Sequence, residues 1–381
     1  MPTTHPTILL IGIGHLGGVL LEFLARDEGL GKIIACGRNR ARGEARCNVA
    51  RLGALAQGLS AQIEFCQVDI TDRERFAETL ETRAPDLVIS TATMQTWWLP
   101  ELLPDRARAR LQRARFGTWL PLHLAPTLSL MEAIRSSSFS GPVLTAPFPD
   151  VVNCVLGKID LAPTCGIGNV DEIVAKVRAT AARYLETPTA SVQALMVAHH
   201  ALESAAFGGH KEAAPPYFLR IYQDGTDVTG SVDTEEILFS PYPLSGGPTI
   251  AFFTCSSALR LVRTLLGETE TLLHAPAPGG LPGGYPVHVS QLQVTPATIP
   301  GLDLAAAIDI NERSHAFDGI ESIEADGTAV FVPEGVQIMR DELGYDCPQL
   351  APADAHERGA ELVARFKEYA ARHGVDLEQL A

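Results

Sequence analysis

The chain has 381 residues, of which 46% are hydrophobic and 20% charged, and its formal net charge is −15. This length suffices for two domains with separate cores, because a single core stops growing near about 250–300 residues. The acidic balance argues against nucleic acid or an anionic membrane as the main partner, since both require basic surfaces. The seven cysteines are scattered without CxxC spacing, which predicts reduced thiols and no zinc site.

The N-terminal apolar run lacks a preceding basic region, and glycines interrupt it from Gly12 onward. This pattern is not that of a signal peptide. No stretch of the sequence approaches the roughly 20 apolar residues that span a bilayer. We therefore expect a cytoplasmic protein with no membrane association.

The stretch from Ile8 to Gly18 carries the strongest motif: an apolar run leads directly into Gly-Ile-Gly-His-Leu-Gly-Gly, and a helical apolar pattern follows. Strand, glycine turn and helix in this order predict the first unit of a dinucleotide-binding fold. Gly12 would form the tight turn, Gly14 would admit a pyrophosphate, and Gly17 would let the helix pack closely on the strand. Backbone N–H groups at the helix start, which holds His15 and Leu16, would bind the phosphates.

The next strand, residues 32–37, ends at Gly37 and is followed by Arg38, Asn39 and Arg40, with Arg42 close behind. NAD-preferring sites place a carboxylate here to bind the ribose 2′-hydroxyl. Guanidinium groups suit a 2′-phosphate, which they can bind in bidentate fashion. We therefore expect NADP in preference to NAD. The alternative interpretation is that these arginines form a solvated loop and helix start.

Strands predicted at residues 62–68 and 86–90 flank a helix at 73–83, and this alternation predicts a parallel sheet. The first half resembles the NADP-binding domain of the saccharopine dehydrogenase-like and short-chain-reductase-like families. The residues that carry this resemblance are Gly12, Gly14, Gly17, Gly37, Arg38, Asp69 and the strand before Ser90, Thr91 and Ala92. It implies that Asp69 lies near the adenine, and that Ser90, Thr91 and Ala92 lie near the nicotinamide ribose.

Residues 94–121 hold all three tryptophans and five arginines, and they follow the carboxyl end of the fourth strand. Ligands bind at that end of open α/β sheets, so a lid with a substrate-facing Arg115 or Trp97 is one interpretation. An amphipathic helix from Pro104 to Arg115 packed on the domain is the other.

The run from Ser140 to Lys158 resembles the malate/lactate dehydrogenase superfamily, in which a strand ends in Asn-Pro before an acid and an apolar helix. The resemblance continues at a glycine turn before Asp171, and at a strand over residues 189–198 that leads to His199 and His200. It implies that His199 exchanges the hydroxyl proton, that Asp171 orients it, and that His200 takes the place of a glycine. Asn169, with Arg115 and Trp97, could contact substrate.

Two positions depart from that superfamily. Ala146 stands where it has the Asn, and Val174 stands where it has the carboxylate-binding Arg. A valine cannot hold a carboxylate in bidentate fashion. A simple 2-hydroxy acid is therefore not the expected substrate. Which histidine faces the nicotinamide stays open, because neighbours on a strand point to opposite sides.

His199 and His200 also allow other interpretations. With Glu203 they could bind a metal, although three ligands on one extended segment converge poorly, and they could simply be satisfied histidines at a strand end. Cys154 and His199 together would suit the NAD- and metal-dependent glycosidase family that shares this architecture. We expect no metal.

The sequence thus predicts an α/β protein with a Rossmann doubly wound parallel sheet and a second α+β domain like that of malate/lactate dehydrogenases. The expected boundaries are 1–150 for the NADP-binding domain and 151–381 for the substrate domain. The expected function is hydride transfer between NADP and a small-molecule carbonyl/alcohol or imine/amine, in a homodimer. An opine-type condensation, the glycosidase, and a non-catalytic NADP-responsive binding or scaffold protein are the alternatives.

Overall fold

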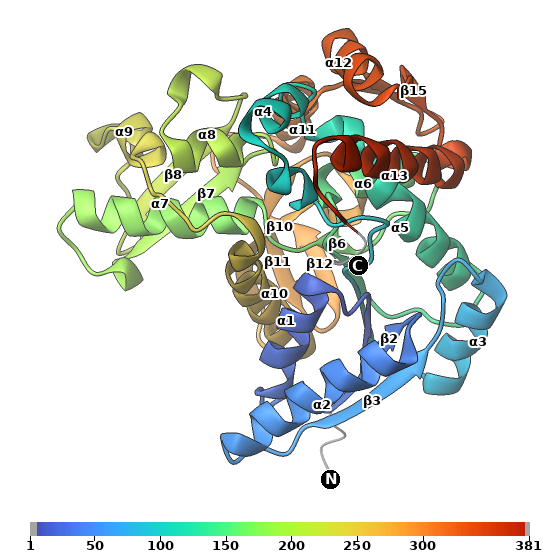
Figure 1. The fold of residues 1–381 in the computed structure, drawn as a ribbon. Coiled ribbons are helices and arrows are strands. Elements are labelled where there is room, and N and C mark those ends of the chain that lie inside the picture. The colour runs from blue at the N-terminus through green and yellow to red at the C-terminus, as the bar shows by residue number, and fades with distance from the viewer. Residues whose placement is uncertain (1–5, 378–381) are drawn as a thin grey trace.

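A six-stranded parallel sheet forms the first half of the molecule, and its order is β3-β2-β1-β4-β5-β6. The computed structural model describes residues 6–377 (Figure 1). The strands are β1 (Ile8–Ile11), β2 (Lys32–Gly37), β3 (Gln62–Gln67), β4 (Leu87–Ser90), β5 (Val143–Thr145) and β6 (Cys165–Gly166). This is the strand order of the doubly wound dinucleotide-binding fold, as the sequence predicted.

Helices cover both faces of the sheet, and all four residues of β1 are therefore buried. Ile8 and Leu10 belong to one apolar cluster with residues of α1, α2 and α10. Leu9 and Ile11 belong to a second cluster with residues of α3, α5 and α13. The helices concerned are α1 (His15–Ala25), α2 (Arg40–Ala56), α3 (Arg73–Arg83), α5 (Leu120–Arg135), α6 (Pro149–Gly157), α10 (Ala251–Leu266) and α13 (Ala355–Arg372).

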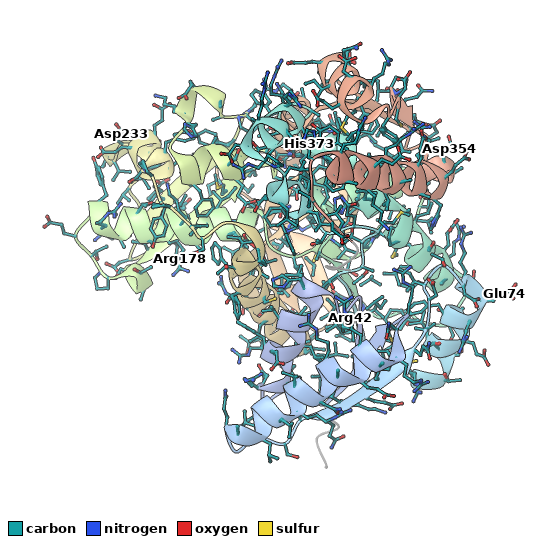
Figure 2. All side chains as sticks on the ribbon, in the orientation of Figure 1. Arg42, Glu74, Arg178, Asp233, Asp354 and His373 are labelled. Atoms are coloured by element: carbon teal, nitrogen blue, oxygen red, sulfur yellow. The ribbon has the colours of Figure 1, made fainter. Side chains whose placement is uncertain are left out.

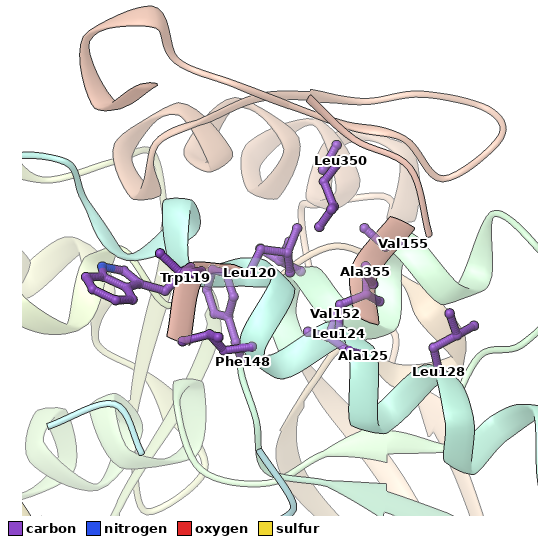
Figure 3. Packing of buried hydrophobic residues seen from close by; sticks show 14 of the residues in the cluster. Trp119, Leu120, Leu124, Ala125, Leu128, Phe148, Val152, Val155, Leu350 and Ala355 are labelled. Carbon is purple, nitrogen blue, oxygen red and sulfur yellow. The ribbon is translucent and has the colours of Figure 1, made fainter. Parts of the chain in front are cut away.

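The last helix, α13, returns to the first half and lies along α5 (Figure 1). Figure 3 shows the apolar side chains between the segments that meet here, among them Trp119, Leu120, Phe148 and Ala355. Trp119 meets the ring of Phe366 edge to face, with 5.4 Å between the ring centroids. The N-terminal half is therefore completed by the C-terminal end of the chain.

The second half contains three small antiparallel sheets. Their strands are β7 (Val192–Val197), β8 (Phe218–Gln223), β9 (Thr226–Asp227), β10 (Thr271–Pro276), β11 (Gly284–Ser290), β12 (Gln293–Pro296), β13 (Ile320–Ile323), β14 (Ala329–Phe331) and β15 (Gln349–Leu350). The other helices are α4 (Asp105–Gln112), α7 (Val170–Tyr184), α8 (Leu202–Gly208), α9 (Thr234–Phe239), α11 (Leu304–Ser314) and α12 (Pro333–Leu343). A third apolar cluster lies between α7, α8, α9, β7 and β8.

Two sequence expectations differ from the structure. The sixth strand, Cys165–Gly166, pairs with β5, so the parallel sheet continues past the expected boundary at residue 150. The sequence of residues 249–254, TIAFFT, predicts a strand, but these residues form the end of the short helix η6 (Gly247–Ile250) and the start of α10. Packing explains the second difference: Ala251, Cys255 and Ala258 are spaced to bury one helical face against α1, and tertiary contacts override the strand preference of neighbouring aromatic residues.

One helix among residues 6–377, Gly247–Leu266, is long and apolar enough by length and composition to cross a membrane. The sequence expectation of no such stretch does not hold by that measure. Its buried residues lie on one face that packs against α1 and β11, which is typical of a helix covering a protein core.

Candidate active site

A cavity of about 1410 Å³ opens at the carboxyl ends of the parallel strands, where open α/β sheets bind ligands. Its first part is lined by the glycine turn after β1 and by the ends of β2 and β4. Its second part is lined by residues at the starts of α7 and α8 and at the end of the short helix η8 (His315–Asp318). Residues from both halves of the sequence therefore face one cavity.

The glycine turn has the geometry of a phosphate cradle. Gly12 has a φ of +84°, and a Cβ there would lie 2.7 Å from the Ala92 nitrogen. A Cβ on Gly17 would lie 2.2 Å from the Gly12 carbonyl oxygen, which also accepts a 2.6 Å hydrogen bond from Thr91 Oγ1. Gly14 is the N-cap of α1 and has open space at its Cβ position, so the backbone at the helix N-terminus is accessible to an anion.

The structure brings most of the expected cofactor-binding residues to this part of the cavity. Those that line it are Gly12, Gly14, His15, Leu16, Gly17, Arg38, Asn39, Asp69, Thr91 and Ala92. Ser90 is fully buried in β4 and does not line the cavity. Arg40 does not line it either, because its guanidinium donates to Gln67 and Glu44.

Three arginines line the cavity near the end of β2. Arg38 follows the strand, and Arg42 and Arg46 lie on α2. Asn39 caps α2 by accepting a hydrogen bond from the Arg42 nitrogen. Figure 2 labels Arg42, which is in the first turn of α2. No carboxylate follows β2 in the sequence before Arg42.

The second part of the cavity contains an ion pair between His200 and Asp318. His200 Nδ1 lies 2.8 Å from Asp318 Oδ2, and both residues line the cavity. Burial lowers the pKa of His200, but the carboxylates of Asp318, Glu203 and Asp150 outweigh it and raise the pKa to about 10. The same pairing holds the pKa of Asp318 well below its usual range, against the effect of burial. Asp318 thereby fixes the imidazole ring and leaves Nε2 as the nitrogen free to meet a ligand.

The sequence interpretation of His199 and Asp171 is corrected here. His199 is fully buried and does not line the cavity, and its Nδ1 lies 3.3 Å from Asp318 Oδ2. Asp171 accepts a hydrogen bond from Ser257 and lies 3.7 Å from Arg260, so it orients neither histidine. The reason is local: β7 ends at Val197 and the chain turns at the histidines, which carries His200 into the cavity.

Asp150 holds two segments of this site together. Its carboxylate accepts a hydrogen bond of 3.0 Å from the His200 nitrogen and another from Asn169 Nδ2. Asn169, expected to contact substrate, does line the cavity and starts α7 with a φ of +49°. Phe148, which starts α6, also has a positive φ and lines the cavity. Strained residues of this kind gather at functional sites.

Aromatic rings surround His200. The centroid of Phe116 lies 5.1 Å and that of Phe148 5.2 Å from the His200 ring. His123 stacks on Phe116, and burial together with the charge of His200 lowers the pKa of His123 to about 3. His200 is therefore the charged ring of this group, and His123 is a neutral one.

Two further carboxyl groups line the cavity beside the ion pair. Glu172 is in the first turn of α7, and Glu203 is in the first turn of α8. Burial and the adjacent Glu203 raise the pKa of Glu172 well above its usual value. Burial also raises the pKa of Glu203, against the effect of His200. Sequence reasoning did not assign a role in this site to Glu172 or Asp318, because each acquires its place only through the fold.

Only part of the tryptophan- and arginine-rich segment, residues 94–121, lines the cavity. Trp97 lines the cavity, whereas Arg115 donates a hydrogen bond to the Ala316 carbonyl oxygen and does not line it. In α4, Arg110 pairs with Glu342 of α12, as expected of a helix packed on the domain. Whether this segment moves as a lid stays a prediction.

Among residues 6–377 no group of three His, Cys, Asp or Glu residues is arranged to hold a metal ion. Burial raises the pKa of the Cys154 thiol to about 12.

No protein-family model and no curated protein matches this sequence. Solved structures do match the fold. The lactate dehydrogenase of Eimeria maxima, with NADH and oxamate, is 13% identical with a TM-score of 0.55, over 83% of this chain and 93% of that chain. The malate dehydrogenase of Plasmodium falciparum, in complex with NADH, is 15% identical with a TM-score of 0.53, over 82% and 95%. The lactate dehydrogenase of Cryptosporidium parvum, with lactic acid and nicotinamide adenine dinucleotide, is 15% identical with a TM-score of 0.53, over 82% and 98%.

At these identities the likeness concerns the fold, and function has to be argued from the residues of the site. The resemblance of the first half to the saccharopine dehydrogenase-like families stays a prediction. From the strand order, the cavity and these matches we conclude that the chain has the fold of the lactate and malate dehydrogenases.

Proposed function

We propose that this protein is an NADP-dependent oxidoreductase that reduces a small-molecule carbonyl or imine, with His200 as the proton donor and Asp318 as the residue that positions it. One observation carries the proposal: the His200–Asp318 pair faces the same cavity as the glycine turn. A nicotinamide cofactor bound on that turn would supply the hydride. Gly12, Gly14 and Gly17, the backbone at the start of α1, and Thr91 and Ala92 would hold it.

The preference for NADP rests on charge. Arg38, Arg42 and Arg46 line the cavity near the end of β2, and guanidinium groups bind a phosphate with charge-assisted hydrogen bonds. NAD-preferring sites instead offer a carboxylate to the 2′-hydroxyl. The dehydrogenases named above were solved with NADH or with nicotinamide adenine dinucleotide. The choice between NADP and NAD is therefore tested first, by comparing the binding of NADPH and NADH.

His200 suits proton donation to a carbonyl oxygen or imine nitrogen. Because Asp318 and the other carboxylates raise the pKa of His200 to about 10, the ring is protonated at neutral pH. A positioned acid contributes about 10²- to 10⁴-fold to a rate. The charged ring is also the form that stabilises negative charge developing on the reacting oxygen. These properties favour reduction as the direction supported by this site.

The first test is a titration of the full chain with NADPH and NADH, followed by the fluorescence of the reduced cofactor. Arg38→Ala should weaken NADPH binding about 10-fold, since a hydrogen bond to a charged group contributes about 1.5–3 kcal/mol, and should change NADH binding by less than twofold. Arg40→Ala is the matched control, because Arg40 does not line the cavity. Absence of binding of both cofactors would overturn the proposal.

A second test concerns catalysis. His200→Asn should lower the turnover of reducible substrates by at least about 100-fold while NADPH binding is retained. His210→Asn is the control, because His210 is exposed and lies outside the cavity. If NADPH binds and no carbonyl or imine is turned over by the unmodified protein, the NADP-responsive binding protein becomes the better interpretation.

A further inference from the structure

We infer that the substrate carries a positively charged amino group close to its reacting carbon, and that Glu172 and Glu203 bind this group. The inference rests on the proposed oxidoreductase function of the same cavity and names its substrate class. It follows from the charges that line the second part of the cavity.

The part of the cavity around His200 is rich in acids and lacks strong bases. Glu172, Glu203 and Asp318 line it, and Asp150 lies behind them in hydrogen-bonding contact with the His200 nitrogen. Among residues 6–377, α7, α8 and η8 contribute no Arg or Lys to the lining. The lining arginines belong to the region after β2, and Lys367 belongs to α13. His200 is therefore the cationic group available to these four carboxyls.

The nearby cationic side chains, Lys176 and Arg260, have other partners. Lys176 of α7 donates hydrogen bonds to the carbonyl oxygens of Ile237 and Leu238. Arg260 lies beside Asp171, outside the cavity lining. Neither contacts Glu172, which is 97% buried and has hydrogen bonds with the side chains of Thr254 and Glu203 but no cationic partner among these residues. Buried carboxylates are costly unless a counter-charge or hydrogen-bond donor accompanies them.

The pKa directions of Glu172 and Glu203 also bear on the charge of this part of the cavity. Burial and the neighbouring Glu203 raise the pKa of Glu172 well above its usual value, and burial raises the pKa of Glu203 against the effects of His200 and of the hydrogen bond with Glu172. Even with Glu172 protonated, the carboxylates of Asp150 and Asp318, which both contact His200, outnumber its one positive charge. An ammonium group would balance this excess and would also donate hydrogen bonds to the glutamates.

Other substrate classes fit these charges less well. A carboxylate on the substrate would add a like charge to the acids at close range, which disfavours binding. A neutral hydroxyl could donate a hydrogen bond but would leave the excess charge in place. The rings of Phe116, Phe148 and Phe207, which also line the cavity, are compatible with a cation because aromatic faces attract positive charge.

The reaction of such a substrate balances with the residues present. In an amino ketone, the carbonyl carbon gains the hydride that NADPH supplies, and the carbonyl oxygen gains the proton from His200 Nε2. The product is the amino alcohol, NADPH is oxidised to NADP⁺, and His200 regains its proton from solvent. The ammonium group keeps its charge throughout and serves to orient the carbonyl beside His200.

The test uses three compounds with one carbon skeleton: 1-amino-2-propanol, 1,2-propanediol and lactate, which are a cation, a neutral molecule and an anion at pH 7. Binding to the full chain saturated with NADPH is measured by calorimetry, so that the alcohols form unreactive complexes and no turnover is needed. We expect the amino alcohol to bind at least 10-fold more tightly than the diol, and lactate to bind most weakly.

Variants connect the preference to the glutamates. Glu203→Gln and Glu172→Gln should each weaken amino alcohol binding about 10-fold and leave diol binding within twofold. Glu212→Gln is the matched control, because this glutamate is exposed and lies outside the cavity. Circular dichroism and NADPH binding of each variant establish that it is folded.

The outcomes separate the two proposals. If NADPH does not bind the unmodified protein, the proposed function fails together with the inference. If NADPH binds and lactate or the diol equals or exceeds the amino alcohol, or none of the three binds, the substrate class is wrong while the oxidoreductase proposal stands. Unchanged amino alcohol binding in both glutamine variants would equally overturn the assignment of Glu172 and Glu203.

Discussion

The His200–Asp318 pair predicts a specific pH dependence of stability, which Asp318→Asn would expose. The substitution keeps the size of the side chain and removes its charge. In the unmodified protein the pKa of His200 is raised from its usual value of 6.5 to about 10. Folding therefore favours the protonated ring, and the stability that this provides is fully present below about pH 6.5 and is lost as the pH rises through about 10.

The magnitude follows from the shift. One pKa unit corresponds to about 1.4 kcal/mol, so the shift of His200 corresponds to about 4–5 kcal/mol at pH 6 as an upper value. Breaking one partner of a buried ion pair costs about 3–5 kcal/mol by a separate route. Glu203 and Asp150 still act on His200 in the variant. We therefore expect Asp318→Asn to lose about 2–4 kcal/mol of unfolding free energy at pH 6, and less than about 1 kcal/mol at pH 10.

The assay is equilibrium unfolding in urea at pH values from 6 to 10, for the unmodified protein and the variant. Asp346→Asn is the control, because Asp346 forms an exposed pair with Arg340 and such pairs contribute about 0–1 kcal/mol. A difference between the unmodified protein and Asp318→Asn that stays constant over this pH range would refute the reasoning. So would a variant that is as stable as the unmodified protein at pH 6.

Two further predictions concern packing and the phosphate cradle. Gly17→Ala should lower the unfolding free energy by at least about 2 kcal/mol and abolish NADPH binding, because its Cβ would lie 2.2 Å from the Gly12 carbonyl oxygen. Gly14→Ala should fold normally, because its Cβ meets open space. Urea unfolding and cofactor fluorescence measure both, and equal stability of the two variants would contradict the expectation. Phe366→Ala should cost about 3–5 kcal/mol in the same unfolding assay, because this fully buried ring anchors α13 on Trp119; a loss below about 1 kcal/mol would show that α13 is not part of the cooperative core.

The sequence alone was sufficient where the signal is local. The apolar run, the three glycines and the helix after them lie within one short stretch, and the structure has β1, the turn and α1 there. The same holds for the helix at residues 73–83, because periodicity and turn chemistry act between neighbours in the chain.

The proposed proton-transfer site needed the tertiary structure because its partners are distant in sequence. Asp318 lies 118 residues after His200, and no local pattern connects them. The sequence assigned the orienting role to Asp171 by resemblance, but the fold directs Asp171 to Ser257 and places Asp318 against the imidazole. Which of His199 and His200 lines the cavity likewise depends on the turn after β7. Local sequence determines which elements form, whereas the packing of distant elements determines which charged side chains meet in one cavity.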